Sequence, residues 1–148
     1  LDAWQKRLAG INFSSGNANH GRAVFETLSC AACHLGSNRL GPSLKGIATR
    51  FDVHDLFMHT IDPNAAISPA YDAVQITTND GELFAGGLIY DSPDGIILET
   101  GPGTVIRITG DQVAAREPVR VSPMPEGLLD QATDEDLADL YGYLKTMN

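Results

Sequence analysis

Residues 133–148 carry the clearest helical pattern of the chain. Apolar residues recur there at the i, i+3, i+4, i+7 spacing of a helix with one buried face. They are Leu137, Leu140, Tyr141 and Leu144. Thr133 stands before this stripe as an N-cap, and Asp136 takes the capping-box position. The pattern predicts a C-terminal helix that begins after Thr133 and packs on a core.

Three further segments show shorter helical patterns. They are residues 1–10, 21–28 and 52–61. Asn17 or Asn19 is placed to cap the second of them, and Asp52, with Asp55 three positions later, is placed to cap the third. Residues 35–50 contain several glycines and a proline, and we expect them to form a loop.

Between residues 72 and 121 the pattern changes from helical to alternating. Short runs rich in β-branched residues are separated by Gly, Pro, Asn and Asp, which is typical of strands joined by tight turns. The predicted strands are 74–77, 83–90, 96–99, 105–108 and 113–121. The predicted turns lie at 79–81, 92–95 and 101–103. We expect this segment to form a compact antiparallel sheet or a small barrel.

The composition is that of one globular domain. With 148 residues, 43% of them hydrophobic and 20% charged, the chain can bury one core. No apolar run approaches membrane-spanning length, so we expect no membrane span. A net charge of −9 disfavours nucleic acid and favours a basic partner, although such a charge can also serve solubility alone. Without a starting Met or a signal peptide, the sequence is expected to be a mature or excised segment.

The motif that carries chemistry is Cys30-Ala31-Ala32-Cys33-His34. It has the C-x-x-C-H spacing of covalent c-type haem attachment. Two thiols one helical turn apart can each add to a haem vinyl group, and the histidine after the second thiol can supply the proximal iron ligand. Since these are the only cysteines in the chain, the motif predicts one haem c held by Cys30, Cys33 and His34.

Two other interpretations of the cysteines stay open. A redox dithiol is expected after a strand in a thioredoxin-like unit, whereas the residues before Cys30 favour a helix. A zinc site could combine Cys30 and Cys33 with two of the three histidines His34, His54 and His59, although the chain has no second paired motif.

An iron held by His34 has a second axial position, and its occupant decides between electron transfer and ligand chemistry. Met124 is the best candidate, because Pro123 and Pro125 stiffen the loop that carries its thioether. The other candidates are expected to have packing, terminal or surface positions instead. They are Met58, Met147, His20, His54 and His59.

The two propionates of a buried haem would need hydrogen-bond donors. Arg39 and Arg50 follow the haem motif closely and are the first candidates, with Lys45 and Tyr71 as lesser ones. Each arginine has an ordinary alternative as an exposed surface residue, because arginine is mostly found at protein surfaces.

Taken together, these features resemble a class I c-type cytochrome. The residues that carry the resemblance stand in that family's order: Phe25, Cys30-x-x-Cys33-His34, Gly41-Pro42-x-Leu44, Met124-Pro125 and Leu140-x-x-Tyr143-Leu144. The resemblance implies that the Pro42 carbonyl accepts the proton on the second ring nitrogen of His34. It also implies that the first and last helices cross, with Gly21 and Phe25 near Tyr143.

The central strands depart from ordinary members of that family. With them, the chain is similar to the haem-binding domains of planctomycete-type bacteria, through Asp62-Pro63-Asn64, Asn79-Asp80-Gly81 and Ser122-Pro123-Met124-Pro125. The expected fold class is a mainly α cytochrome c fold with an inserted small antiparallel β-sheet or barrel (α+β), in one domain. Its helical core would span 11–71 and 122–148, and its β insertion would span 72–121. The resemblance also implies a place at the C-terminal end of a larger protein.

The resemblance implies electron transfer rather than enzymatic catalysis, and the sequence shows no catalytic carboxylate pair, nucleophile–base pair or phosphate loop. The expected partner is a redox protein or a fused dehydrogenase domain. The expected location is periplasmic or otherwise extracytoplasmic, because c-type haem is attached after export. Two alternatives stay open: a haem enzyme or gas-sensing domain with an open distal site, and an interaction module formed by residues 72–121 with haem as a tether.

Overall fold

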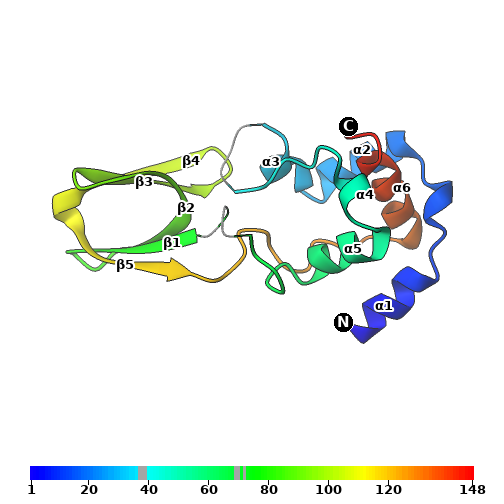
Figure 1. Cartoon of the computed structure of the whole chain (residues 1–148), viewed down its shortest axis with the longest axis horizontal. Coiled ribbons are helices and arrows are strands. Elements are labelled where there is room, and N and C mark those ends of the chain that lie inside the picture. Colours follow the sequence, from blue (N-terminus) through cyan, green and yellow to red (C-terminus); the bar gives the residue numbers. More distant parts are fainter. Residues whose placement is uncertain (37–39, 69–70, 72) are drawn as a thin grey trace. The chain divides into compact units, whose positions relative to one another are not determined.

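A computed structural model describes residues 1–36, 40–68, 71 and 73–148. By its internal contacts the chain divides into two compact units, whose elements are labelled in Figure 1. The helical unit comprises Leu1–Leu35, Ser43–Ala65 and Pro125–Asn148. The sheet unit comprises Gly36–Pro42 and Ala66–Met124.

The helical unit contains all the α-helices of the described residues. They are α1 (Asp2–Ala9), α2 (Ala18–Thr27), α3 (Cys30–His34), α4 (Ile47–Arg50), α5 (Val53–Ile61) and α6 (Asp134–Leu144), with the 3-10 helix η1 (Phe13–Ser15) between α1 and α2. The helices predicted near residues 1–10, 21–28 and 52–61 and after Thr133 are confirmed. The loop predicted over residues 35–50 is wrong in its last part, where Gly46, at φ +67°, turns the chain into α4.

The predicted helix starts are confirmed by their capping hydrogen bonds. Asn17 caps α2 through its side-chain oxygen, which accepts backbone N–H groups of the first turn. The Asp52 carboxylate accepts the N–H of Asp55 at 3.0 Å. At the start of α6, the Thr133 hydroxyl accepts the N–H of Asp136 at 3.1 Å, and the Asp136 carboxylate accepts the N–H of Thr133 at 2.8 Å.

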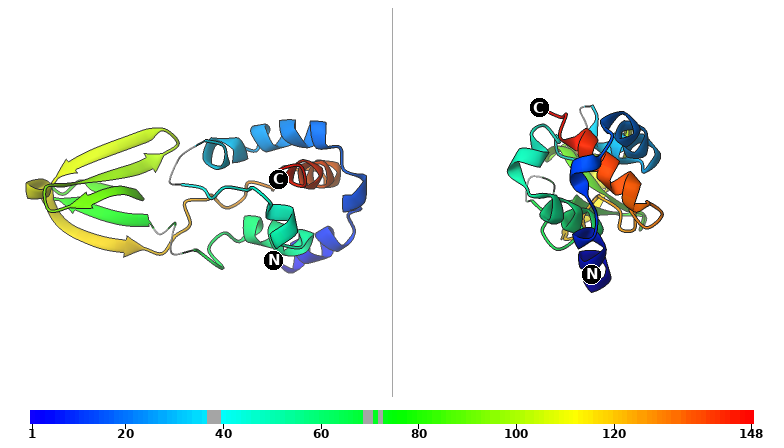
Figure 2. Two further views of the ribbon diagram at one scale, coloured as in Figure 1. Left: turned by 45° about the horizontal axis from the view of Figure 1, so that its top comes forward. Right: turned by 90° about the vertical axis from the view of Figure 1, so that its right-hand side faces the viewer.

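The helical unit buries one core, to which five of its helical elements and the segment before α6 contribute. Its buried members are Leu8, Phe13, Val24, Phe25, Leu56, Phe57, Leu129, Ala132, Leu137, Ala138, Leu140 and Leu144. Helices α2 and α6 lie side by side (Figure 2), so close that a side chain at Gly21 would overlap the backbone of Asp139. Phe25 meets Tyr143 edge-on, with 5.4 Å between ring centroids. The expected approach of Gly21 and Phe25 to Tyr143 is confirmed.

The described residues of the sheet unit form a five-stranded antiparallel sheet in the order β4-β3-β2-β1-β5. Its strands are β1 (Ala73–Thr78), β2 (Leu83–Ser92), β3 (Gly95–Gly101), β4 (Thr104–Thr109) and β5 (Val113–Val119). All five predicted strands and the three predicted turns are confirmed. The 3-10 helix η3 (Gly110–Gln112) carries the chain from β4 to β5, at opposite edges of the sheet.

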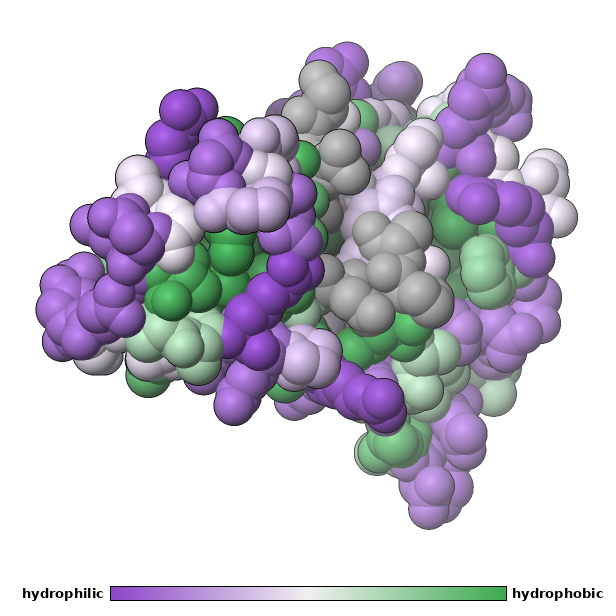
Figure 3. Space-filling view, turned by 60° about the vertical axis from the view of Figure 1, so that its left-hand side comes forward, coloured by the Kyte–Doolittle hydropathy of each residue, from purple (hydrophilic) through white to green (hydrophobic). Residues whose placement is uncertain are grey.

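The sheet folds over itself, so that β3 and β4 lie across from β1 and β5 (Figures 1 and 2). A second core fills the space between them; its buried members are Val74, Ile76, Ile96, Leu98 and Ile108. Two turns fasten η3: the N–H of Asn79 donates to the Gln112 carbonyl at 2.9 Å, and the N–H of Gly110 donates to the Asp94 carbonyl at 2.9 Å. In Figure 3 hydrophobic residues of this unit, drawn green, are framed by hydrophilic ones, drawn purple.

The expectation of a mainly α cytochrome c fold with a small β insertion is wrong, because the chain is an α+β protein whose five-stranded antiparallel sheet belongs to a compact unit of its own. The residues between 73 and 119 are not a small addition to a helical core. Their backbone groups pair with one another in the sheet, and their apolar side chains, such as Ile76 and Leu98, are fully buried within their own cluster. Such a segment makes its own layer of structure, which the motifs at the two ends of the chain do not reveal.

Candidate functional site

The three chemically active residues of the sequence motif share one face of helix α3. They occupy positions i, i+3 and i+4 of the helix Cys30–His34, and these positions lie on the same side of an α-helix. Neither cysteine is in a disulfide bond, and Cys30, Cys33 and His34 are each half-buried. Helix α3 therefore presents two thiols and an imidazole together.

The chain enters α3 through a strained residue. Ser29 has φ +64° and ψ +10°, which is the left-handed region, and among the described residues no other non-glycine residue has positive φ. This conformation costs an L-residue roughly 1–2 kcal/mol. It ends α2 at Leu28 and gives α3 its own direction, and such strain is found preferentially at functional sites.

Cys30 lies in apolar surroundings. Together with Leu28 and Ala31 it packs against the core of the helical unit, and its Sγ is 3.9 Å from the Leu28 carbonyl. Burial raises the pKa of the Cys30 thiol to about 11, and the neighbouring Cys33 adds to the rise. Redox dithiols depend on a thiolate whose pKa is lowered. The environment of Cys30 therefore disfavours the dithiol interpretation.

The histidines considered for a zinc site have aromatic neighbours. His54 lies edge-on to Phe13 at 6.4 Å, and His59 lies edge-on to Phe51 at 5.8 Å, both between ring centroids. Within the described ranges, no three His, Cys, Asp or Glu side chains form a group that could hold a metal ion, so the zinc interpretation gains no support. The surface positions predicted for His54 and His59 are confirmed.

The predicted sixth ligand, Met124, is half-buried at the end of the sheet unit. Its N–H donates to the Ser122 hydroxyl at 3.2 Å, which adds a hydrogen bond to the stiffness that Pro123 and Pro125 give this loop. Because His34 belongs to the helical unit, ligation of one iron by His34 and Met124 stays a prediction. The hydrogen bond predicted between His34 and the carbonyl of Pro42 also stays a prediction, because Pro42 belongs to the sheet unit and His34 to the helical unit.

The competing methionines have packing roles. Met58, on α5, and Met147, after α6, are both half-buried against the core of the helical unit. The Met147 carbonyl also accepts the N–H of Gly46 at 2.5 Å, which ties the C-terminus to the start of α4. The packing role predicted for Met58 is confirmed.

The predicted propionate donors have different surroundings. Arg50 is exposed, and its Nη2 donates to the carbonyls of Ser43 at 3.4 Å and Lys45 at 3.2 Å, so it braces the loop before α4. Tyr71 is half-buried in the sheet unit. Arg39 lies outside the described residues.

One important polar residue was missed by the sequence reasoning. Asp139 is only 5% exposed although it is acidic, and it lies on the buried side of α6. Its carboxylate accepts the N–H of Asn17 at 2.5 Å and lies 2.7 Å from Nδ1 of His20. This hydrogen-bonded pair gives His20 a structural role at the surface. The available signal was a charged residue inside the apolar stripe of Leu137, Leu140 and Leu144.

Among the described residues, no helix is both long and apolar enough to cross a membrane. In comparisons with known proteins, the chain matched no protein-family model and no curated protein sequence.

Proposed function

We propose that this chain is an electron-transfer protein that carries one haem c, attached at Cys30 and Cys33, with His34 as the proximal ligand and Met124 as the sixth ligand. The observation that carries the proposal is the common face of α3 on which two thiols and an imidazole lie together. The chemistry of this donor set fits the group, because the thiols suit two thioether bonds and the imidazole directly after them suits the iron.

Bound haem would supply a one-electron iron couple. The residues of the chain would determine where it sits and how it is tuned. Cys30 and Cys33 would hold it covalently to a helix that is itself anchored on the core through Ala31. The thioether of Met124 would raise the reduction potential relative to a second histidine. A ligand from a loop stiffened by prolines would also keep the iron environment similar in both oxidation states.

The proposal includes a redox partner or a fused dehydrogenase domain, and an extracytoplasmic location. The net charge of −9 supports a partner with a basic surface, since opposite charges steer diffusional encounter.

Attachment is tested by expressing the chain together with a c-type haem maturation system and staining denaturing gels for haem. The wild type should retain haem on the gel, Cys30→Ser and Cys33→Ser should each keep at most one thioether, and the double variant should lose the covalent haem. His34→Ala should give no stable holoprotein. A wild-type chain without covalent haem, or a double variant that keeps it, would overturn the proposal.

The sixth ligand is tested by Met124→Ala. This variant should shift the ferric iron toward high spin, lower the reduction potential and allow CO or cyanide to bind, because water would replace the sulfur. Met58→Leu is the matched control and should change none of these properties, since Met58 packs on the core. A wild-type protein that is already high-spin and binds CO rapidly would favour the haem enzyme or gas sensor over electron transfer.

The propionate assignment is tested by Arg50→Ala, which should change the reduction potential and its pH dependence. Arg22→Ala is the control, because Arg22 is exposed and pairs with Glu26 of its own helix, at 3.2 Å. Equal potentials in the wild type and Arg50→Ala would remove Arg50 from the site.

A further inference from the structure

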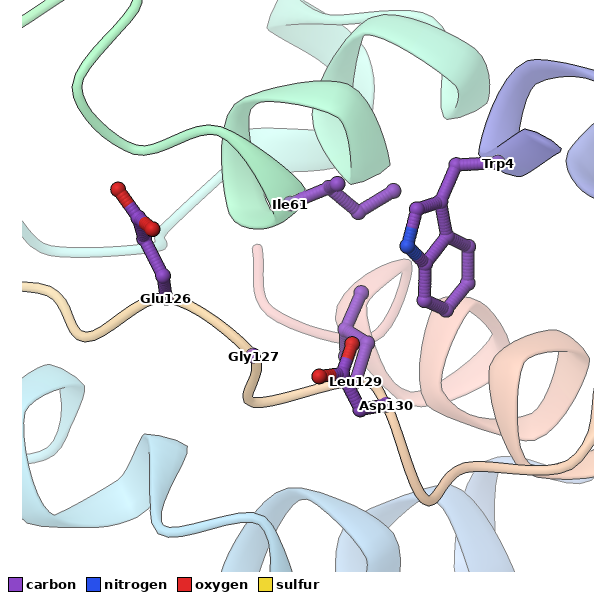
Figure 4. Close-up of a pocket in the computed structure, with 6 residues that line it drawn as sticks. All are labelled: Trp4, Ile61, Glu126, Gly127, Leu129 and Asp130. Carbon is purple, nitrogen blue, oxygen red and sulfur yellow. The ribbon is translucent and has the colours of Figure 1, made fainter. Parts of the chain in front are cut away.

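The helical unit contains a pocket of about 300 Å³ that none of the predicted haem-binding residues lines. It is lined by Trp4, Ile61, Glu126, Gly127, Leu129 and Asp130 (Figure 4). Trp4 and Glu126 lie at opposite sides of it, and Ile61 lies across from Leu129 and Asp130. The pocket thus joins a wall of apolar side chains to two carboxylates.

Among the described residues, the two carboxylates have no positively charged partner. Within the part of the chain that the structure describes, no lysine, arginine or histidine lies within ion-pair distance of Glu126 or Asp130. Glu126 accepts one hydrogen bond, from the side-chain amide of Asn64 at 2.6 Å. Both acidic residues are exposed, and two neighbouring acidic side chains attract cations to the mouth of the pocket.

The aromatic wall is held in place from outside the pocket. The guanidinium of Arg7 lies 4.7 Å from the centroid of the Trp4 ring. Arg7 is itself fixed, since its Nε donates to Asp134 at 2.7 Å and its Nη2 to the Ala132 carbonyl at 2.5 Å. The positive charge of Arg7 is therefore paired with the carboxylate of Asp134. Because Arg7 is fixed, its contact with the Trp4 ring holds that ring in place when the pocket is empty.

We propose that this pocket receives a lysine side chain of a basic partner protein. The apolar wall of Trp4, Ile61 and Leu129 suits the four-carbon stem of lysine, and the two carboxylates suit its ammonium group. Leu129 is 2% exposed and belongs to the core of the helical unit, so packing in the core fixes this part of the pocket lining. The net charge of −9 favours encounter with a basic surface, and the two carboxylates offer that surface a contact at this pocket. That the pocket contacts a redox partner rests on the proposed electron-transfer function. That the pocket binds a lysine side chain does not depend on that function.

The test measures binding of two capped tripeptides, Gly-Lys-Gly and Gly-norleucine-Gly, to the purified full chain by NMR. The lysine peptide should shift the indole N–H signal of Trp4 and the amide signals of Gly127 and Asp130, and the norleucine peptide should bind about tenfold more weakly or not at all, because it lacks the ammonium group. The double variant Glu126→Gln, Asp130→Asn should lose the preference for lysine, and its glutamine still offers an oxygen to Asn64.

The matched control is the double variant Glu82→Gln, Glu117→Gln. It removes the same charge from two exposed residues of the sheet unit and should keep the preference for lysine. Equal binding of the two peptides to the wild type, or an equal loss of binding in both double variants, would overturn the inference. Lysine binding to a chain without covalent haem would leave the pocket in place and refute only the proposed function, whereas a haem-loaded chain that does not bind lysine would refute only the pocket.

Discussion

The helical unit and the sheet unit bury their cores in different ways. The helical unit joins three separate stretches of the chain, so that Leu8 and Leu137 belong to one core. In the sheet unit four of the strands follow one another through short turns, and Ile76 and Leu98 belong to one core within a continuous segment. Contacts between distant residues therefore hold the helical unit together, whereas pairing between neighbouring strands accounts for most of the sheet.

The polar contacts differ in the same way. The helical unit places the buried carboxylate of Asp139 between α6 and α2, where Asn17 and His20 satisfy it. In the sheet unit the ladder satisfies the backbone, and hydrogen bonds from Asn79 and Gly110 fasten η3. A buried carboxylate is costly unless hydrogen bonds satisfy it. The comparison teaches that a few polar side chains connect α2 and α6, whereas backbone hydrogen bonds make most of the polar contacts between the strands.

The largest effect is expected for Gly21→Ala. The added Cβ would overlap the backbone carbonyl of Asp139, and α6 would have to move away from α2. We expect a loss of about 3 kcal/mol in the free energy of unfolding, the upper end of the range for overpacking. Chemical denaturation measures the loss, and hydrogen exchange should show that the amides of α2 and α6 lose protection. Gly10→Ala is the control, since its Cβ would lie 3.5 Å from the Arg7 carbonyl and should cost little.

A glycine-to-alanine substitution in the sheet unit tests whether the two units lose stability independently. In Gly86→Ala the Cβ would overlap the carbonyl of Glu99 on β3. We expect a loss of about 1–3 kcal/mol, with reduced hydrogen-exchange protection in β2 and β3 and unchanged protection in α2 and α6. Equal loss of protection over all helices and strands in both variants would mean that the two units unfold as one, and the distinction would fail.

The polar contact is tested by Asp139→Ala. This change leaves the N–H of Asn17 without its acceptor, and we expect a loss of about 1–3 kcal/mol in the free energy of unfolding. Asp139→Asn should lose less, because its amide oxygen can still accept from Asn17. Asp130→Ala is the control, as Asp130 is exposed. Identical stability of Asp139→Ala and the control, measured by denaturation, would contradict the assigned role.

A smaller, pH-dependent effect is expected from His20. The hydrogen bond to Asp139 holds the pKa of His20 above its ordinary value, and the charges of Asp136 and Glu135 act in the same direction. The stability from this pair should be fully present below the unfolded pKa of about 6.5 and should disappear as the pH rises through the folded pKa. The difference in free energy of unfolding between the wild type and His20→Gln should therefore shrink with rising pH. A difference that grows with pH would refute this assignment.

The smallest effect is expected for Ser29→Gly. Glycine adopts positive φ without strain, but it also loses more backbone entropy on folding, so the net gain in stability should be roughly 0–1 kcal/mol. Thermal unfolding measures it. Ser29→Ala should not stabilise the protein, because alanine keeps the Cβ that causes the strain. A stabilising Ser29→Ala would show that the left-handed conformation is not what costs energy there.

Local features were determined by the sequence itself. The capping residues Asn17, Asp52 and Thr133, the turns of the sheet, and the spacing of Cys30, Cys33 and His34 each depend on residues a few positions apart. Short-range geometry and hydrogen bonding are enough to specify such features, so their prediction succeeded. The chemistry proposed at α3 likewise rests on a spacing that the sequence alone displays.

The approach of Phe25 to Tyr143 was expected from the sequence motifs, but only the tertiary structure decided the other features that join distant segments. It placed β5 beside β1, buried Asp139 against Asn17, and gathered Trp4 and Leu129 around one pocket. It also showed that the strands form a unit with its own core, which contradicts the expected mainly α fold with a small insertion. These outcomes depend on which apolar surfaces meet after the chain folds back on itself, and residue spacing holds no information about that choice.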